Sequence, residues 1–227
     1  LTRFPNLDTI FRLYSERTDR LASISQPVLA KNAAELHEHF GVSPDLYRWV
    51  PNQIDLPGTL ARSVEPIDTD IADWVQPDDF LFITIGRLSI EKNQELLIRG
   101  FALIAEQHPK SKLLIVGSGF LREQLMDLVD ELGLTDRVLL AGQRSNPFPL
   151  LKRSDCFVLS SVHEGQPMVI LEAMTLGTPV LSTDLVGVRQ MLDGRFGSLV
   201  DHTVESMAGG LVAAIKGRVP HEPFDAA

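Results

Sequence analysis

Two carboxylates and two cations in this sequence have types and spacings that could do chemistry. Glu164 and Glu172, with seven residues between them, flank the start of an apolar stretch, HEGQPMVILEAM. In GRLSIEKN, Gly86 is expected to form a turn from which Arg87 and Lys92 project together. Two fixed cations suit a diphosphate. The alternative is that these charged side chains are solvated surface groups.

The stretch that carries the two acids is predicted to begin a helix. Pro167 suits the first helical position, where its missing N–H is no loss. The amides of Met168 and Val169 are then unpaired donors at the positive end of the helix, which can hold an anion. At 100° per residue, Glu172 shares a face with Met168 and Thr175, away from the apolar positions. Simple solvent exposure of Glu172 is the other explanation.

The elements that must position these residues alternate along the chain from residue 80. Short apolar runs predict strands buried on both faces, at 80–86, 112–117, 137–142, 155–161, 179–184 and 197–200. Helical patterns lie between them, at 93–108, 121–133, 146–154, 167–177 and 186–192. This alternation is typical of an α/β fold with a doubly wound, parallel, Rossmann-like sheet, whose ligands bind at the carboxyl ends of the strands.

The GSGFLR segment resembles the start of a dinucleotide fingerprint without completing it. Arg122 stands where the third glycine should be, and the loop follows the second strand rather than the first. Gly117 therefore indicates either a tight turn or a close approach to a ligand.

The first 79 residues follow a different pattern. Strands are predicted at 21–25 and 47–52, on either side of a helix over 26–41 that ends at a Gly41 cap. Residues 51–79 hold prolines and acids without lasting periodicity, so they are predicted to be a linker or a surface excursion.

Composition narrows the class of protein. With 44% hydrophobic and 22% charged residues, the 227-residue chain is predicted to be globular. A net charge of −9 argues against a nucleic-acid partner. Cys156 is expected to be a buried spacer. No apolar run is long enough to span a membrane and no signal-like segment opens the chain, which favours a cytoplasmic protein. The chain starts at Leu1 without a methionine, which suggests a fragment of a longer protein.

Four segments, in their order and spacing, resemble a known family over about residues 47–216: GRLSIEKN, GSG, GQRSNPFPLLKRSDCFVLSS and EGQPMVILEAMTLGTPV. They are similar to the carboxyl-terminal, donor-binding lobe of retaining GT-B glycosyltransferases of group 1 (family 4). The resemblance implies the carboxyl-terminal half of a two-lobed GT-B architecture. It also implies transfer of a sugar from a nucleoside-diphosphate sugar to an acceptor, in cell-surface glycan or glycolipid synthesis.

The resemblance also implies roles for individual residues. Arg87 and Lys92 would bind the diphosphate, Glu164 would lie beside the transferred sugar, and Glu172 would accept from the ribose hydroxyls. The catalytic set is thus Arg87, Lys92 and Glu164. The sequence shows no metal-ligand cluster, so the scheme needs no metal and no cofactor beyond the donor substrate. The implied donor contacts are Gly86, Gly117, Arg144, Gly165, Gln166, Pro167, Met168, Val169 and Glu172.

The same resemblance organises the chain. Residues 1–50 would be the tail of an amino-terminal lobe and the interlobe crossing, and 80–227 the nucleotide-sugar-binding domain. Gln53 departs from the glycine usual at the crossing, and Gln166 from the apolar or aromatic residue of many relatives. Because the missing lobe would hold the acceptor, the fragment alone is expected to be inactive. A peripheral contact of that lobe with the inner face of the membrane is left open.

Two other functions remain open at this point. The chain could be a non-catalytic nucleotide-binding or regulatory lobe, or part of a sugar-nucleotide epimerase of the same fold.

Overall fold

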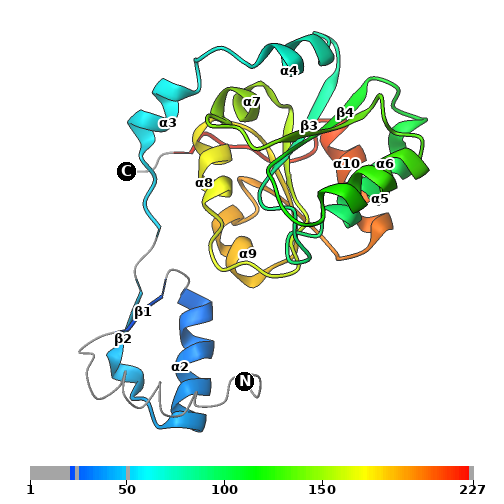
Figure 1. Cartoon of the computed structure of the whole chain (residues 1–227). Coiled ribbons are helices and arrows are strands. Elements are labelled where there is room, and N and C mark those ends of the chain that lie inside the picture. Colours follow the sequence, from blue (N-terminus) through cyan, green and yellow to red (C-terminus); the bar gives the residue numbers. More distant parts are fainter. Residues whose placement is uncertain (1–20, 24–25, 50–51, 225–227) are drawn as a thin grey trace. The chain divides into compact units, whose positions relative to one another are not determined.

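The computed structural model describes residues 21–23, 26–49 and 52–224 (Figure 1). The chain divides between Gln53 and Ile54 into two units. Residues 1–20, predicted to belong to the tail of an amino-terminal lobe, lie outside the described part, as do 225–227 at the other end.

The smaller unit is a strand–helix–strand arrangement, as predicted. Its elements are β1 (Leu21–Ser23), α2 (Gln26–Phe40), the 3-10 helix η1 (Pro44–Leu46) and β2 (Tyr47–Trp49), and its two strands pair in parallel. Helix α2 ends at Gly41, which has φ of +67° and donates its amide to the His37 carbonyl at 3.0 Å. A left-handed residue there favours glycine, so the predicted cap is confirmed. The predicted strand residues 24–25 and 50–51 lie outside the described part.

The larger unit is built on a six-stranded parallel sheet, which confirms the predicted fold class. Its strands run in the order β5-β4-β3-β6-β7-β8, so the order reverses between β3 and β6. Each strand is four to six residues long, as expected for strands in a sheet covered on both faces. The strands are β3 (Phe80–Ile85), β4 (Ser111–Val116), β5 (Val138–Gly142), β6 (Cys156–Leu159), β7 (Val180–Thr183) and β8 (Gly197–Val200).

Helices cover both faces of this sheet, and each face has its own core. Helices α5 (Gln94–Ala105), α6 (Arg122–Glu131) and α10 (Val204–Ile215) lie on one face (Figure 1). The other face carries α7 (Phe148–Arg153), α8 (Met168–Thr175) and α9 (Val186–Leu192).

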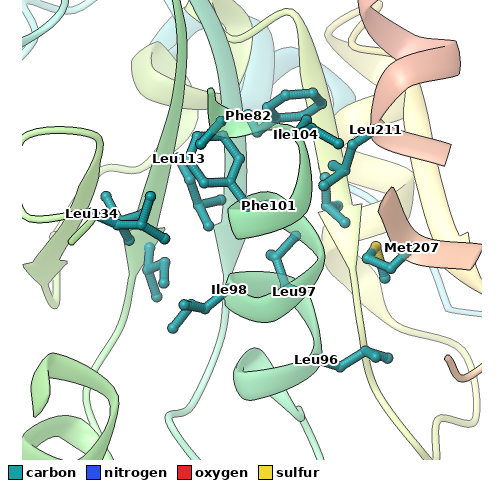
Figure 2. Close-up of a cluster of buried hydrophobic side chains, with 14 of the residues drawn as sticks. Phe82, Leu96, Leu97, Ile98, Phe101, Ile104, Leu113, Leu134, Met207 and Leu211 are labelled. Atoms are coloured by element: carbon teal, nitrogen blue, oxygen red, sulfur yellow. The ribbon is translucent and has the colours of Figure 1, made fainter. Parts of the chain in front are cut away.

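The two cores arise because successive strand residues point to opposite faces. Figure 2 shows the first core, where Phe82 of β3 lies near Phe101 of α5 and Leu211 of α10 is close by. Ile83, the residue after Phe82 on β3, belongs to the second core. Cys156 is fully buried in the first core, as predicted, and burial raises the pKa of its thiol.

The stretch predicted to be a linker or surface excursion contains two short helices. They are α3 (Leu56–Arg62) and α4 (Thr69–Trp74), and the larger unit includes them. Ile71 of α4 is 1% exposed and belongs to the second core. These helices have seven and six residues, too few for a periodic pattern to be recognised in the sequence.

Candidate functional site

The two loops that carry the predicted residues meet where the strand order reverses. One follows β3 and the other follows β6, so both lie at the carboxyl edge of the sheet. The Val162 amide donates to the Glu91 carbonyl at 2.8 Å, and Ser160 Oγ donates to the Lys92 carbonyl at 2.9 Å. These bonds hold the loops together at the position where open α/β sheets bind ligands.

The loop after β3 is a fixed turn. The Ser89 carbonyl accepts from the amides of Lys92 at 3.1 Å and Asn93 at 3.2 Å. Asn93 then takes the left-handed conformation, φ 47° and ψ 47°, as the N-cap of α5. Gln94 Nε2 donates to the Arg87 carbonyl at 2.9 Å and ties the beginning of the loop to its end. The turn therefore sets where the Arg87 and Lys92 side chains start.

Lys92 and Glu164, both predicted catalytic residues, form an ion pair. The Lys92 side chain passes over Gly86, where an added Cβ would lie 3.5 Å from Lys92 Cε. The two side chains are 26% and 14% exposed. Ser161 Oγ donates to the same Glu164 oxygen, Oε1, at 2.8 Å. The structure thus joins a cation and an acid that are far apart in the sequence.

A pocket of about 280 Å³ lies at the ends of β3, β4 and β5, and its lining includes Gly86, over which the Lys92 side chain passes. Arg87 is exposed and lines it. Gly117 also lines it, and a Cβ there would lie 1.9 Å from the Gly86 carbonyl oxygen. Gly117 therefore makes a tight turn, with φ of +144°, and forms part of the pocket wall. The full lining is Ile85, Gly86, Arg87, Val116, Gly117, Ser118, Gln143, Arg144 and Pro147.

Arg144 lines the pocket, and its guanidinium pairs with Asp70 of α4 and with Asp68, the N-cap residue of that helix. Nη1 lies 2.9 Å from Asp68 Oδ2, and Nη2 lies 2.5 Å from Asp70 Oδ2. The hydrogen bond with Asp70 contributes most to raising the pKa of Arg144. A direct contact between Arg144 and a ligand stays a prediction.

Helix α8 begins one residue later than predicted. Pro167 is its N-cap rather than its first helical residue, because a ψ of 119° makes it extended. The Pro167 carbonyl accepts from the Ile170 amide at 3.1 Å, which leaves Met168 and Val169 in the first turn. These two amides thus remain at the positive end of the helix, as expected.

Glu172 lies half-buried on α8, outside the pocket lining. Ile170 and Ala173 are fully buried against the sheet, so Glu172 is on the other face, as the helical spacing predicts. Burial raises the pKa of Glu172, and the positive charge of Arg62, on α3, lowers it in part. Arg62 also donates through Nη2 to the Ser145 carbonyl at 2.8 Å.

Three residues that shape the site were not predicted from the sequence. Ser161 could have been found by its place three residues before Glu164, in a loop after a strand. Gly187 stands in a helical pattern, where glycine is disfavoured, and a Cβ there would lie 1.6 Å from the Gly165 carbonyl oxygen. The sequence around Arg62 gives no indication of a role at the site, since only the fold brings Arg62 near Glu172.

Within residues 21–23, 26–49 and 52–224, no three or more His, Cys, Asp or Glu side chains form a group that could hold a metal ion. Over the same residues, no helix is long and apolar enough to cross a membrane.

Comparison with known proteins adds to this geometry. The family model described as Glycosyl transferases group 1 matches residues 67–223. The chain is 39% identical over 163 residues to an uncharacterized glycosyltransferase of Methanocaldococcus jannaschii, which covers 71% of this chain and 40% of that protein. It is 34% identical over 193 residues to the N-acetylgalactosamine-N,N'-diacetylbacillosaminyl-diphospho-undecaprenol 4-alpha-N-acetylgalactosaminyltransferase of Campylobacter jejuni, covering 84% of this chain and 50% of the other.

Solved structures share the fold. Anabaena HepE, crystallised with UDP and glucose, superposes with a TM-score of 0.76 at 23% identity, over 93% of this chain and 57% of HepE. The chain spans about half the length of the two curated relatives, from Methanocaldococcus jannaschii and Campylobacter jejuni.

Proposed function

The chain belongs to the group 1 glycosyl transferases, and on this premise we propose that it is the donor-binding lobe of a retaining glycosyltransferase. The observation that carries the proposal is the meeting of two loops at the strand-order reversal. There Lys92 pairs with Glu164, beside the pocket that Arg87 lines. Cations next to carboxylates suit a ligand that has both a diphosphate and hydroxyl groups. A nucleoside-diphosphate sugar has both.

The residues would divide the chemistry as follows. As the glycosidic bond breaks, negative charge develops on the departing nucleoside diphosphate, and Arg87, Lys92 and the first amides of α8 would stabilise it. Glu164 would contact the transferred sugar, and Glu172 would accept hydrogen bonds from the ribose hydroxyls. Because side-chain cations and helix amides supply the positive charge, the proposed scheme assigns no step to a metal ion or a further cofactor.

The proposed substrates follow from the relatives. The Campylobacter relative is by name a sugar transferase to a diphospho-undecaprenol-linked acceptor, which supports a role in glycan or glycolipid synthesis. UDP is the first nucleotide to test, because HepE binds it. The family match and the Campylobacter relative support a transferase over an epimerase or a purely regulatory lobe.

We also propose that residues 54–224 bind the donor without transferring the sugar. Transfer needs an acceptor hydroxyl held in line with the anomeric carbon and a closed site that excludes water. In a two-lobed enzyme a facing lobe would supply both.

The test is isothermal titration calorimetry of the chain with UDP, GDP, ADP and CDP, with and without a chelator. We expect one of the four to bind, with the same affinity after chelation. Lys92→Ala should weaken that binding about tenfold or more, the scale of one charge-assisted hydrogen bond. The proposal is wrong if no diphosphate binds, or if the free nucleoside binds as tightly as its diphosphate.

A further inference from the structure

The Glu164 carboxylate neutralises Lys92, which is one of the two cations proposed to bind the diphosphate. A single carboxylate oxygen, Glu164 Oε1, accepts from both Lys92 Nζ and Ser161 Oγ. At 26% and 14% exposure, the two charged side chains are partly removed from water. Solvent therefore screens their attraction less than it would screen that of a fully exposed surface pair.

Buried hydrogen bonds hold Glu164 in this position. Ser161 is fully buried, and its carbonyl accepts from Thr183 Oγ1, on β7, at 2.6 Å. Thr183 is fully buried as well. The loop that carries Glu164 is thus fixed to the end of β7, and Ser161 directs the carboxylate toward Lys92.

The backbone of the cation is fixed in the same way. The Lys92 carbonyl accepts from Ser160 Oγ at 2.9 Å, and Ser160 is 1% exposed. Both members of the ion pair therefore project from loops bonded to one another, so their contact follows from the fold.

We propose that Glu164 is the resting counter-ion of Lys92 and competes with the nucleoside diphosphate for it. The inference rests on the proposed function, and it gives Glu164 a part in nucleotide binding that the resemblance does not imply. A diphosphate at Lys92 would place negative charge next to the Glu164 carboxylate, which would then leave Nζ and keep Ser161 as its donor. After transfer, the return of Glu164 to Lys92 would speed release of the product diphosphate.

A double-mutant cycle tests the competition, with the diphosphate that binds the wild-type chain most tightly among UDP, GDP, ADP and CDP. Glu164→Gln should lower its dissociation constant by roughly three- to tenfold, the scale of a partly buried ion pair. In the Lys92→Ala background, Glu164→Gln should change the constant by less than about twofold, because the cation is absent.

The matched control is Asp78→Asn. It removes a carboxylate that also pairs with a lysine, Lys110, but precedes β3 and so lies at the opposite edge of the sheet. Asp78→Asn should leave the dissociation constant unchanged. Stopped-flow measurements should show slower release of the diphosphate from Glu164→Gln than from wild type. Melting temperatures of all variants show whether each is folded.

Unchanged binding by Glu164→Gln would overturn the inference, because the carboxylate would then not compete for Lys92. Weaker binding would also overturn it, because Glu164 would then be positioning Lys92. Equal tightening in the Lys92→Ala background would also overturn it, because simple charge repulsion would suffice. If the wild-type chain binds none of the four diphosphates, the proposed function itself fails.

Discussion

Replacing Glu172 by glutamine should stabilise the protein and weaken nucleotide binding at the same time. Glu172 is half-buried, and burial raises its pKa above the ordinary value of 4.5. Glutamine has nearly the same shape without the charge, so it removes the cost of burying a carboxylate. It also removes the charged acceptor that we propose for the ribose hydroxyls.

The pH dependence of the stability gain follows from the direction of the pKa shift. The folded protein holds the Glu172 proton more tightly than the unfolded chain does. Glu172 therefore favours the folded state below its unfolded pKa, and this contribution is lost as the pH rises through its raised folded pKa. Discounted for solvent screening, the gain from glutamine should be roughly 0.5–1 kcal/mol near pH 8. For a chain of this length that is a melting temperature about 1–4 °C higher, and the difference should shrink as the pH falls toward 4.5.

The affinity loss can be assigned to the ribose with a modified ligand. A hydrogen bond to a charged group contributes about 1.5–3 kcal/mol, so Glu172→Gln should weaken diphosphate binding roughly ten- to a hundredfold. Wild type should bind the 2′,3′-dideoxy diphosphate weakly, and Glu172→Gln should discriminate much less between the two ligands. Differential scanning calorimetry at pH 5 and pH 8 and isothermal titration calorimetry provide the measurements.

Glu131→Gln is the matched control, because it removes an exposed carboxylate from α6, and it should leave nucleotide affinity unchanged. Our explanation is wrong if Glu172→Gln weakens binding of the ribose and dideoxy ligands equally. It is also wrong if the variant melts at a lower temperature than wild type at pH 8.

Two further predictions concern the packing of the Gly165 loop and the ion pairs that attach α4. Gly187→Ala should displace the Gly165 backbone, lower the melting temperature and weaken diphosphate binding at least tenfold, because its Cβ would lie 1.6 Å from a carbonyl oxygen. Gly209→Ala is the control, because a Cβ at this position of α10 would meet nothing within 4 Å. It should change neither quantity, and equal effects of the two variants would contradict the packing argument. Arg144→Ala should lower the melting temperature by about 1–3 °C and Asp70→Asn by less, because Asp68 still pairs with Arg144 in the second variant. Calorimetry that shows no change for Arg144→Ala would mean that these pairs do not hold α4.

Local pattern was enough to predict the sheet and the loops that carry the candidate site. Strands buried on both faces are short continuous apolar runs, and the helices between them have their own period, so β3 to β8 could be recognised without knowledge of their neighbours. Chain order then places the loops at 86–93 and 161–166 after strands, and parallel strands bring such loops to one edge. The acids and cations were predicted to lie there on this basis.

The first residue of a helix and the presence of short helices were harder to predict from the sequence. Pro167 suits either the N-cap or the first helical residue, and only its ψ of 119° distinguishes the two. Helices α3 and α4 are stabilised by what they contact, as Ile71 in the second core and Arg144 against Asp70 show, more than by their own sequence.

The sequence by itself determined which residue types stand at the carboxyl edge of the sheet: two cations after one strand, two acids around one helix, and glycines at the turns. Only the tertiary structure decided their partners, because Lys92 and Glu164 are 72 residues apart and meet through the reversal of strand order between β3 and β6. The same holds for Arg62 and Glu172, whose elements lie next to each other only in the folded chain. Charge and hydrogen bonding act over a few ångströms of space, whereas spacing in the sequence constrains distance only within one element or turn.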